Sequence, residues 1–491
     1  MNPVPIDCLD PHHMLAWFSH TTRNVLWLLL SVLFLITGCK SAEYRAYVYD
    51  PIGATLTEDK PLDPYHRRTI GFTEDGVWFT NEFDGARLND VVRVSPFVYE
   101  LTISAENTPI NNSAWYGFVV ARGEAPWMHG SGVDGGVGQF DRGVGQFDGE
   151  VDSRVDSLEL TLRLRYRGGT HRYQPKLMER IAEDAVEPLG KGATYSYRQI
   201  DSIQTMKIMT EGENIHGLNI RFSVGTNPVL VTAQRLETSH SLQDTLQAWA
   251  TRYPSVHIDT AGFSSENRPI PSLIISQDTQ IQRPTLMVIG RQHPPEVPGY
   301  EVMRSFLHRF AGNDSLANAF RNAFHVVALP MANPDGVDRG HWRHNARGVD
   351  LNRDWINFNQ QETQVARRYF QEKAISLGQP IYAIDFHSTQ IHLMYPIEES
   401  VALEGPAISA PWFDHLLDPE TGYPFEVAIE PFDTSGPVAK NWFWRAFGID
   451  ALTYEVSDLS TLEQNETAGE IAAESLMKTL LNSLESLNSL N

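Results

Sequence analysis

The hydrophobic pattern of this 491-residue chain changes near residue 240, and this change restricts its fold more than any other feature. Before it, apolar and polar residues alternate, most clearly over Leu158–Tyr166. Strict alternation is typical of a half-buried strand. Several such strands with turn signals between them predict an antiparallel β-sandwich over residues 42–240. The other predicted strands are Val91–Ile103, Ala114–Ala121 and Leu218–Val224.

Beyond the change, short apolar strands alternate with helical patterns. A helix is predicted at Ser241–Thr251, and the apolar run Leu286–Ile289 precedes a helix at Glu301–Phe310, whose apolar residues share one face. This alternation predicts an α/β domain over residues 241–490, with a mainly parallel or mixed central sheet flanked by helices. The other predicted elements are strands at Phe324–Leu329, Ile381–Phe386 and Ile449–Tyr454 and a terminal helix at Gly469–Leu487.

An apolar segment at residues 25–37, preceded by Arg23, predicts an export signal at residues 1–39. It is shorter than the ~20 residues that a comfortable membrane span needs. The residues at its end, Ile36-Thr37-Gly38-Cys39, resemble a bacterial lipoprotein signal. We therefore expect Cys39 to be lipidated and to anchor the protein in the cell envelope, facing the periplasm or in the outer membrane. A chance cysteine after a plain signal or anchor is the alternative, and translation could start at Met14.

Charge and cysteine content exclude several functions. The chain has 39 basic and 61 acidic residues and a net charge of −22, which argues against nucleic-acid binding, since phosphate contacts need a basic surface. Its two cysteines are Cys8 and Cys39, so removal of the signal and lipidation would leave no thiol. A cysteine nucleophile and cysteine-ligated zinc are therefore not expected.

Metal-binding side chains follow two of the predicted strands. His293 and Glu296 come after Leu286–Ile289, and His387 directly follows Ile381–Phe386. The carboxyl ends of strands line the ligand site of an open α/β sheet. Two histidines and one carboxylate are a usual ligand set for catalytic zinc, so we predict one Zn²⁺ at these three residues.

A fourth side chain, Glu455, follows the strand Ile449–Tyr454 and is the predicted catalytic carboxylate. The pair His341 and His344 is an alternative source of metal ligands. We expect the remaining histidines, His325 and His392 among them, to be structural or exposed.

This half contains five motifs: HPPE at 293–296, NPDG at 333–336, HWRHNARGVDLNRDW at 341–355, DFHSTQ at 385–390 and TYEVSD at 453–458. Together they resemble the zinc metallocarboxypeptidases, which include the pancreatic carboxypeptidase A/B type, and most closely the cytosolic carboxypeptidase branch with its bacterial relatives. They occur in the family's order over roughly residues 256–460. A β-sandwich ahead of the catalytic domain is also similar to that branch, and SAWYGFVV at 113–120 resembles the segment that opens it.

The resemblance implies a role for each matching residue. His293, Glu296 and His387 match the zinc ligands. Glu455 matches the general base that takes a proton from the zinc-bound water and delivers it to the leaving amine. Arg343 matches the group that polarises the scissile carbonyl and stabilises the oxyanion.

Three further residues match groups around the substrate and the metal. Asn352 and Arg353 match the pair that holds the terminal carboxylate of the substrate, and a guanidinium presents a planar fork that suits this group. Asp350 matches the carboxylate that orients the first zinc histidine, which fixes its tautomer.

The sequence departs from the pancreatic carboxypeptidases at two positions. Phe432 stands where they have a mobile tyrosine, and Pro295 where they have an arginine. Lys440 falls near the segment that lines the specificity pocket, where it could favour an acidic terminal residue; the alternative is a solvated lysine.

We therefore expect a zinc metallocarboxypeptidase that removes C-terminal residues from peptides with a free carboxylate at the cell envelope. One alternative keeps the zinc site and cuts amide bonds of cell-wall (murein) peptides. Another is a catalytically inactive relative that only binds peptides; Phe432 is its only support.

Overall fold

The computed structural model describes residues 50–123, 157–180, 197–199, 204–209, 215–431 and 434–489. The predicted signal, Cys39 and Phe432 lie outside these ranges. The described residues from Pro51 onward belong to one compact unit. Among the described residues, no helix combines the length and the apolar character needed to span a bilayer.

The first half of the described chain builds two sheets that share one core. In these residues one sheet has the strand order β1-β2-β5-β11-β7-β8 and the other β3-β4-β6-β10-β9. Their bounds are β1 Thr69–Phe72, β2 Val77–Thr80, β3 Asp90–Ser95, β4 Val98–Ser104, β5 Gly117–Arg122, β6 Leu158–Arg167, β7 Lys176–Arg180, β8 Tyr197–Gln199, β9 Gln204–Met209, β10 Ile215–Val224 and β11 Val229–Thr232.

Alternation explains the burial of β6. Its Leu160, Leu162 and Leu164 are fully buried, and the residues between them are partly exposed. These leucines join a core to which strands of both sheets contribute. Most strand pairs are antiparallel, as predicted, but β4 and β6 pair in parallel.

The prediction of one strand over Val91–Ile103 is wrong. Two strands, β3 and β4, form a hairpin there, and its turn contains Phe97 at φ 60°. The left-handed conformation is costly for a residue with a Cβ, so a phenylalanine is not expected in a turn that needs it. The periodicity of the segment therefore did not indicate a turn at this position.

The second half builds a mixed sheet of eight strands within the described residues, in the order β12-β13-β15-β14-β16-β19-β17-β18. Its centre, from β15 to β19, is parallel, and antiparallel pairs flank it. The bounds are β12 Val256–Phe263, β13 Pro269–Ile275, β14 Thr285–Gly290, β15 His325–Leu329, β16 Pro380–Thr389, β17 Leu393–Pro396, β18 Ala428–Ile429 and β19 Asp450–Ser457.

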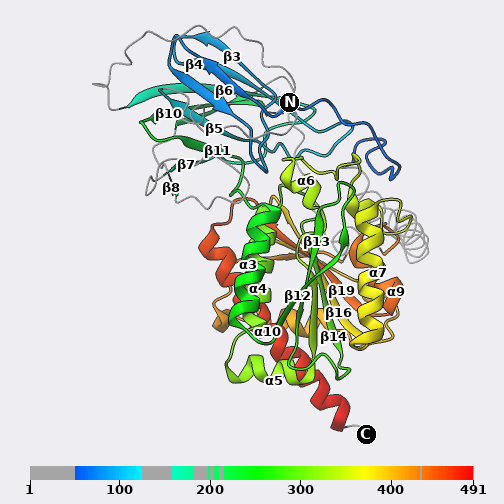
Figure 1. Ribbon diagram of the computed structural model, residues 1–491. Helices are drawn as coiled ribbons and strands as arrows, with labels where there is room; N and C mark the ends of the chain where they lie inside the picture. Colours follow the sequence, from blue (N-terminus) through cyan, green and yellow to red (C-terminus); the bar gives the residue numbers. More distant parts are fainter. Residues whose placement is uncertain are drawn as a thin grey trace, which may run out of the picture. The chain divides into compact units, whose positions relative to one another are not determined.

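Helices cover both faces of this sheet: α3, α4 and α10 lie on one side and α7 and α9 on the other (Figure 1). Their bounds are α3 Ser239–Arg252, α4 Val297–Phe310, α5 Ser315–Ala323, α6 Pro334–Asp338, α7 Gln361–Ser376, α8 Ser409–Leu416, α9 Ala439–Phe447 and α10 Leu462–Ser489, with short 3-10 turns at Leu351–Arg353 and Pro419–Thr421.

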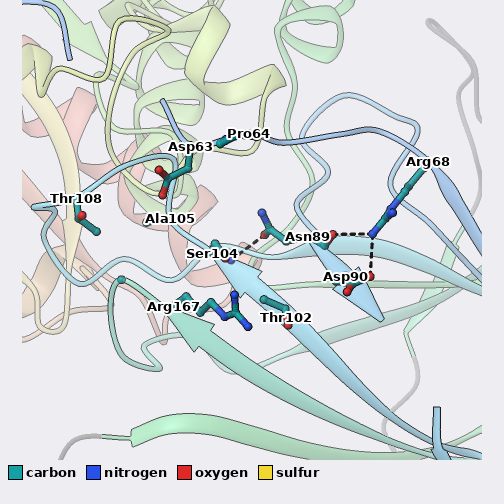
Figure 2. Close-up of a pocket in the computed structure, with 11 residues that line it drawn as sticks. Asp63, Pro64, Arg68, Asn89, Asp90, Thr102, Ser104, Ala105, Thr108 and Arg167 are labelled. Atoms are coloured by element: carbon teal, nitrogen blue, oxygen red, sulfur yellow. Dashed lines mark hydrogen bonds and ion pairs between the residues drawn. The ribbon is translucent and has the colours of Figure 1, made fainter. Parts of the chain in front are cut away.

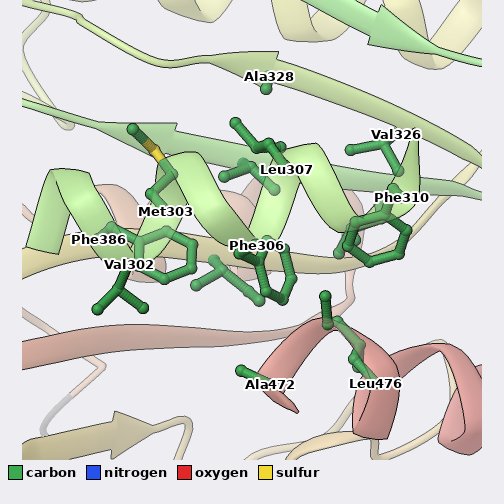
Figure 3. Close-up of a cluster of buried hydrophobic side chains, with 14 of the residues drawn as sticks. Val302, Met303, Phe306, Leu307, Phe310, Val326, Ala328, Phe386, Ala472 and Leu476 are labelled. Carbon is green, nitrogen blue, oxygen red and sulfur yellow. The ribbon is translucent and has the colours of Figure 1, made fainter. Parts of the chain in front are cut away.

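The central strands are apolar on both faces because both faces are covered. In β14, Leu286 and Val288 join the core under α4, whereas Met287 and Ile289 join the core under α7 and α9. Figure 3 shows the apolar face of α4 between the sheet and α10. The predicted fold class, a mixed α/β sheet preceded by antiparallel β-sheets, is confirmed.

Candidate metal centre

The ends of parallel strands deliver the predicted ligands to one edge of the mixed sheet. His293 and Glu296 lie between the end of β14 and the start of α4, where Pro298 occupies the first turn. This turn begins with Arg291 at φ 51°. His387 and Glu455 were predicted to follow their strands. In the structure the strands extend further, and these residues lie within β16 and β19.

Two imidazole nitrogens meet the carboxylate of Glu296. Nδ1 of His293 is 2.9 Å from Oε1, and Nδ1 of His387 is 2.7 Å from Oε2. All three side chains are buried, and their ligand atoms lie within 4.8 Å of one another. Two nitrogens and a carboxylate oxygen at this spacing suit zinc, which leaves a fourth position for water or substrate.

Two aspartates hold the outer nitrogens of the histidines. Asp350 Oδ1 lies 2.9 Å from Nε2 of His293, and Asp385 Oδ2 lies 2.8 Å from Nε2 of His387. Because each Nε2 can donate its proton to a carboxylate, each Nδ1 is available to a metal. The amide of Gln292 donates in turn to both oxygens of Asp385, at 2.9 Å.

Charge reinforces this arrangement. Burial raises the pKa of Glu296, but the charges of His293 and His387 outweigh it and hold that pKa well below its usual range. Burial lowers the pKa of His387, whereas Asp385 and Glu296 raise it more, so the net shift is upward. Glu296 is therefore ionised, as metal binding requires.

Glu455 lies beside this group. It pairs with His387 across β16 and β19, and its Oε2 is buried without a hydrogen-bond partner among the described residues. Burial raises the pKa of Glu455 to about 7, against the charges of the two histidines. A carboxyl group with a pKa near neutrality and an unpaired oxygen is suited to proton transfer.

The predicted substrate-binding residues surround the same centre. Arg343 Nε donates to Asp350 Oδ2 at 2.6 Å. Asn352 accepts from the main chain of Ala439 at 2.9 Å, and its Nδ2 is 3.1 Å from Nε2 of His387. Arg353 is partly buried, and its Nη1 donates to the carbonyl of Asn352 at 2.9 Å.

The Nδ2 of Asn352 has no good acceptor in a metal-bound site. If Nδ1 of His387 binds metal, its Nε2 carries the proton and donates to Asp385, so it cannot accept from Asn352. This amide is then available to another acceptor, such as a carboxylate.

The structure separates the alternative ligands from the centre. The Nδ1 of His344 contacts Oδ1 of Asn107 at 2.7 Å, and the Nδ1 of His341 contacts the His344 carbonyl. In the described ranges, the three predicted ligands are the one group that could hold a metal. His325 is buried, and His392 is partly buried against Phe425, as expected for structural residues.

Lys440 is not solvated. Its residue is 1% exposed, and its Nζ lies 3.4 Å from the carbonyl of Pro396. The solvated alternative is therefore wrong, because α9 carries the side chain into the interior.

Sequence reasoning assigned no role to four residues that shape the site. Gln292 and Asp385 lie next to or near predicted ligands in the sequence, and this proximity could have identified them as residues of the site. Glu106 and Arg172 belong to the sandwich half, where no local pattern marks them. Arg172 donates to Asp458 at 2.7 Å and to the carbonyl of Ser388 at 3.0 Å, next to His387.

Close packing at Gly299 joins the two ligand-bearing segments. Its N–H donates to Ser388 Oγ at 2.8 Å, and a Cβ added here would lie 2.1 Å from the carbonyl oxygen of His387. We expect Gly299→Ala to lower the free energy of unfolding by about 1–3 kcal/mol and to weaken zinc binding. Thermal unfolding and zinc content would measure both effects.

Gly405→Ala is the matched control, because nothing lies within 4 Å of a Cβ added there. A Gly299→Ala protein with wild-type stability and zinc content would contradict the role of this contact.

A separate cavity of about 490 Å³ lies in the sandwich half, around the ends of β3, β4 and β6 (Figure 2). Its polar lining includes Arg68, Asn89, Asp90 and Arg167. None of the metal ligands or substrate-binding residues lines it, so it is distinct from the metal centre.

Comparisons with known proteins agree with this geometry. Residues 242–415 match the family model described as zinc carboxypeptidase. A cytosolic carboxypeptidase-like protein 5 of Danio rerio is 44% identical over 71 residues, 14% of this chain and 8% of that protein. Cytosolic carboxypeptidase 6 of Caenorhabditis elegans is 30% identical over 118 residues, 22% of this chain and 26% of that protein. The matches thus span about a quarter or less of these relatives.

Solved structures share the fold at low identity. A metallo-carboxypeptidase from Burkholderia cenocepacia superimposes with a TM-score of 0.58 and 16% identity, covering 83% of this chain and 99% of that one. A metallo-carboxypeptidase from Pseudomonas aeruginosa gives 0.55 and 15%, covering 82% and 98%. The predicted resemblance and zinc cofactor are confirmed at the level of family: the chain contains a domain of the zinc carboxypeptidase family, with a His/Glu/His group that could hold the metal.

Proposed function

We propose that this protein is a zinc-dependent carboxypeptidase that hydrolyses the C-terminal peptide bond of peptides. The observation that carries the proposal is the meeting of His293, Glu296 and His387 beside Oε2 of Glu455, which is buried and has no hydrogen-bond partner in the described part of the chain. Zinc held by these residues would supply a Lewis acid that polarises a carbonyl, and it would lower the pKa of a bound water to ~7.

Glu455 acts as the general base and then as the general acid. Its carboxylate takes a proton from the attacking water at Oε2 and delivers it to the nitrogen of the leaving amine. The raised pKa of Glu455 suits both steps. A group that titrates near neutral pH can both accept and donate a proton at a low cost in free energy.

Positive charge and hydrogen-bond donors hold the substrate. Arg343 stabilises the negative charge that develops on the carbonyl oxygen, and Asp350 fixes its guanidinium through Nε. The guanidinium of Arg353 and the amide of Asn352 bind the terminal carboxylate, which selects peptides with a free C-terminus.

The raised pKa of Glu455 predicts a pH dependence. Glu455 must be ionised to accept a proton, so kcat/KM falls as the pH drops through its pKa. Burial raises that pKa from 4.5 to about 7, and a zinc ion opposes the rise, so we expect an apparent pKa between these values. A profile of kcat/KM with zinc occupancy checked at each pH would measure it; a rate that does not fall in this range would contradict the assignment.

The chemical test compares substrates. Zinc-loaded protein should release single residues from peptides with a free C-terminus and leave C-terminally amidated peptides intact. Cleavage confined to cell-wall peptides would favour the murein amidase. Peptide binding without cleavage would favour the inactive relative.

Substrate preference depends on Lys440 in this proposal. A buried ammonium near the terminal side chain of the substrate would favour an acidic residue. We therefore expect peptides ending in Glu to be cleaved faster than peptides ending in Phe or Lys. This preference should be lost in Lys440→Gln. Equal rates for the three peptides would contradict this part.

We also propose that the protein acts at the cell envelope as a lipoprotein anchored through Cys39, which the apolar segment and the residues before the cysteine support. Labelled fatty acid should be incorporated by the full-length chain and not by Cys39→Ala. Equal labelling of both would count against this localisation.

A further inference from the structure

We propose that Glu106, from the sandwich half of the chain, is a positioning residue for Arg343; this inference rests on the proposed function. Glu106 follows β4, and its side chain is 1% exposed. It lies 237 residues before Arg343 in the sequence, yet its carboxylate contacts the main chain of the segment that carries this arginine.

The carboxylate accepts three consecutive main-chain N–H groups. Oε2 accepts from Trp342 at 2.7 Å, and Oε1 accepts from Arg343 at 3.0 Å and from His344 at 2.7 Å. Hydrogen bonds to an ionised group are stronger than neutral ones, and buried ones are costly to break. The main chain on both sides of Arg343 is therefore fixed by one side chain.

The flanking side chains are anchored in the same half. Trp342 is fully buried and joins the sandwich core, where its ring meets Tyr166 edge to face. His344 contacts Asn107 at 2.7 Å, and the amide of Asn107 also donates to the carbonyl of Gly348 at 3.1 Å. Adjacent sandwich residues thus hold both ends of the segment 342–348.

Between these anchors, Arg343 connects the segment to the metal centre. Its Nε donates to Asp350 Oδ2 at 2.6 Å, and Asp350 Oδ1 contacts the zinc-ligand candidate His293. An unbroken series of hydrogen bonds therefore leads from Glu106 to the metal centre. The charge on Glu106 persists at working pH: although burial raises its pKa, His341, His344 and Arg87 lower it to about 2.

The functional consequence concerns the transition state. Negative charge on the carbonyl oxygen develops as the water adds to the carbonyl carbon, so a displaced guanidinium weakens transition-state binding more than substrate binding. A misplacement of about 1 Å can cost ~100-fold in rate. We expect Glu106→Gln, which replaces one acceptor oxygen by a donor, to lower kcat about 10- to 100-fold with KM changed less than about 3-fold.

The experiment is a double-mutant cycle with Glu106→Gln and Arg343→Ala in the zinc-loaded full chain. If Glu106 acts through Arg343, its substitution lowers kcat in the wild type and has little further effect in Arg343→Ala. Equal effects in both backgrounds, or no effect in the wild type, would overturn the proposal. Glu100→Gln is the control, because this carboxylate on β4 is 45% exposed and pairs with Arg165.

Crystal structures of zinc-bound wild type and Glu106→Gln give a readout independent of activity. The contact between Arg343 Nε and Asp350 should be lost or lengthened in the variant, and an unchanged contact would overturn the proposal even if the wild type proved inactive. Should Glu106→Gln not fold, Glu106→Asp, which keeps the charge, enters the same cycle. Failure of both to fold would assign Glu106 an architectural role and overturn the proposal.

Discussion

Replacement of Glu455 by glutamine is expected to abolish turnover while the protein keeps its zinc. The amide has the shape of the carboxyl group but cannot accept and return a proton, and general acid–base catalysis contributes about 10²–10⁴-fold. We therefore expect kcat to fall by at least this factor, equivalent to about 3–5 kcal/mol of barrier. Steady-state hydrolysis and zinc analysis of the same sample would measure both quantities.

Glu463→Gln is the control for this substitution. Glu463 is an exposed carboxylate in the first turn of α10, and the same chemical change there should leave kcat and zinc unaltered. Wild-type activity in Glu455→Gln would refute the proposed general base. Loss of zinc in that variant would assign Glu455 to the metal site instead.

Removal of a predicted ligand should have the largest effect on the metal. In wild-type protein lacking residues 1–39 we expect about one zinc ion per chain, as one ligand set implies. In His293→Ala, one of two nitrogen ligands is lost, and Glu296 and Asp350 lose their shared partner. Zinc should then fall well below one per chain, and added zinc should raise the melting temperature of the wild type but not of the variant.

The matched control is His257→Ala, in which an exposed histidine of β12 is removed. It should retain both zinc and activity. Absence of zinc from the wild type, even after reconstitution, would show that the group does not hold the metal and would favour the peptide-binding alternative.

Much of the fold could be predicted because the local pattern reports burial. The leucines of β6 alternate because one face of that strand is covered, and β14 is continuously apolar because both faces are covered. The same patterns predicted His293, Glu296 and His387 near strand ends, where parallel strands meet at one edge of a sheet, although β16 extends two residues beyond His387. The hairpin at Phe97 was missed because a single left-handed residue leaves no periodic signal.

The sequence by itself determined the class of fold, the three candidate ligands and the candidate base, since these depend on periodicity and on short motifs. Only the tertiary structure decided that His387 and Glu455 pair across β16 and β19. It also decided that His344 contacts Asn107 instead of the metal centre, and that Lys440 is buried. It also brought Glu106 to the segment of Arg343 across 237 residues. Strand pairing and contacts between distant segments follow from the packing of the whole chain, and no local pattern of residue types records them.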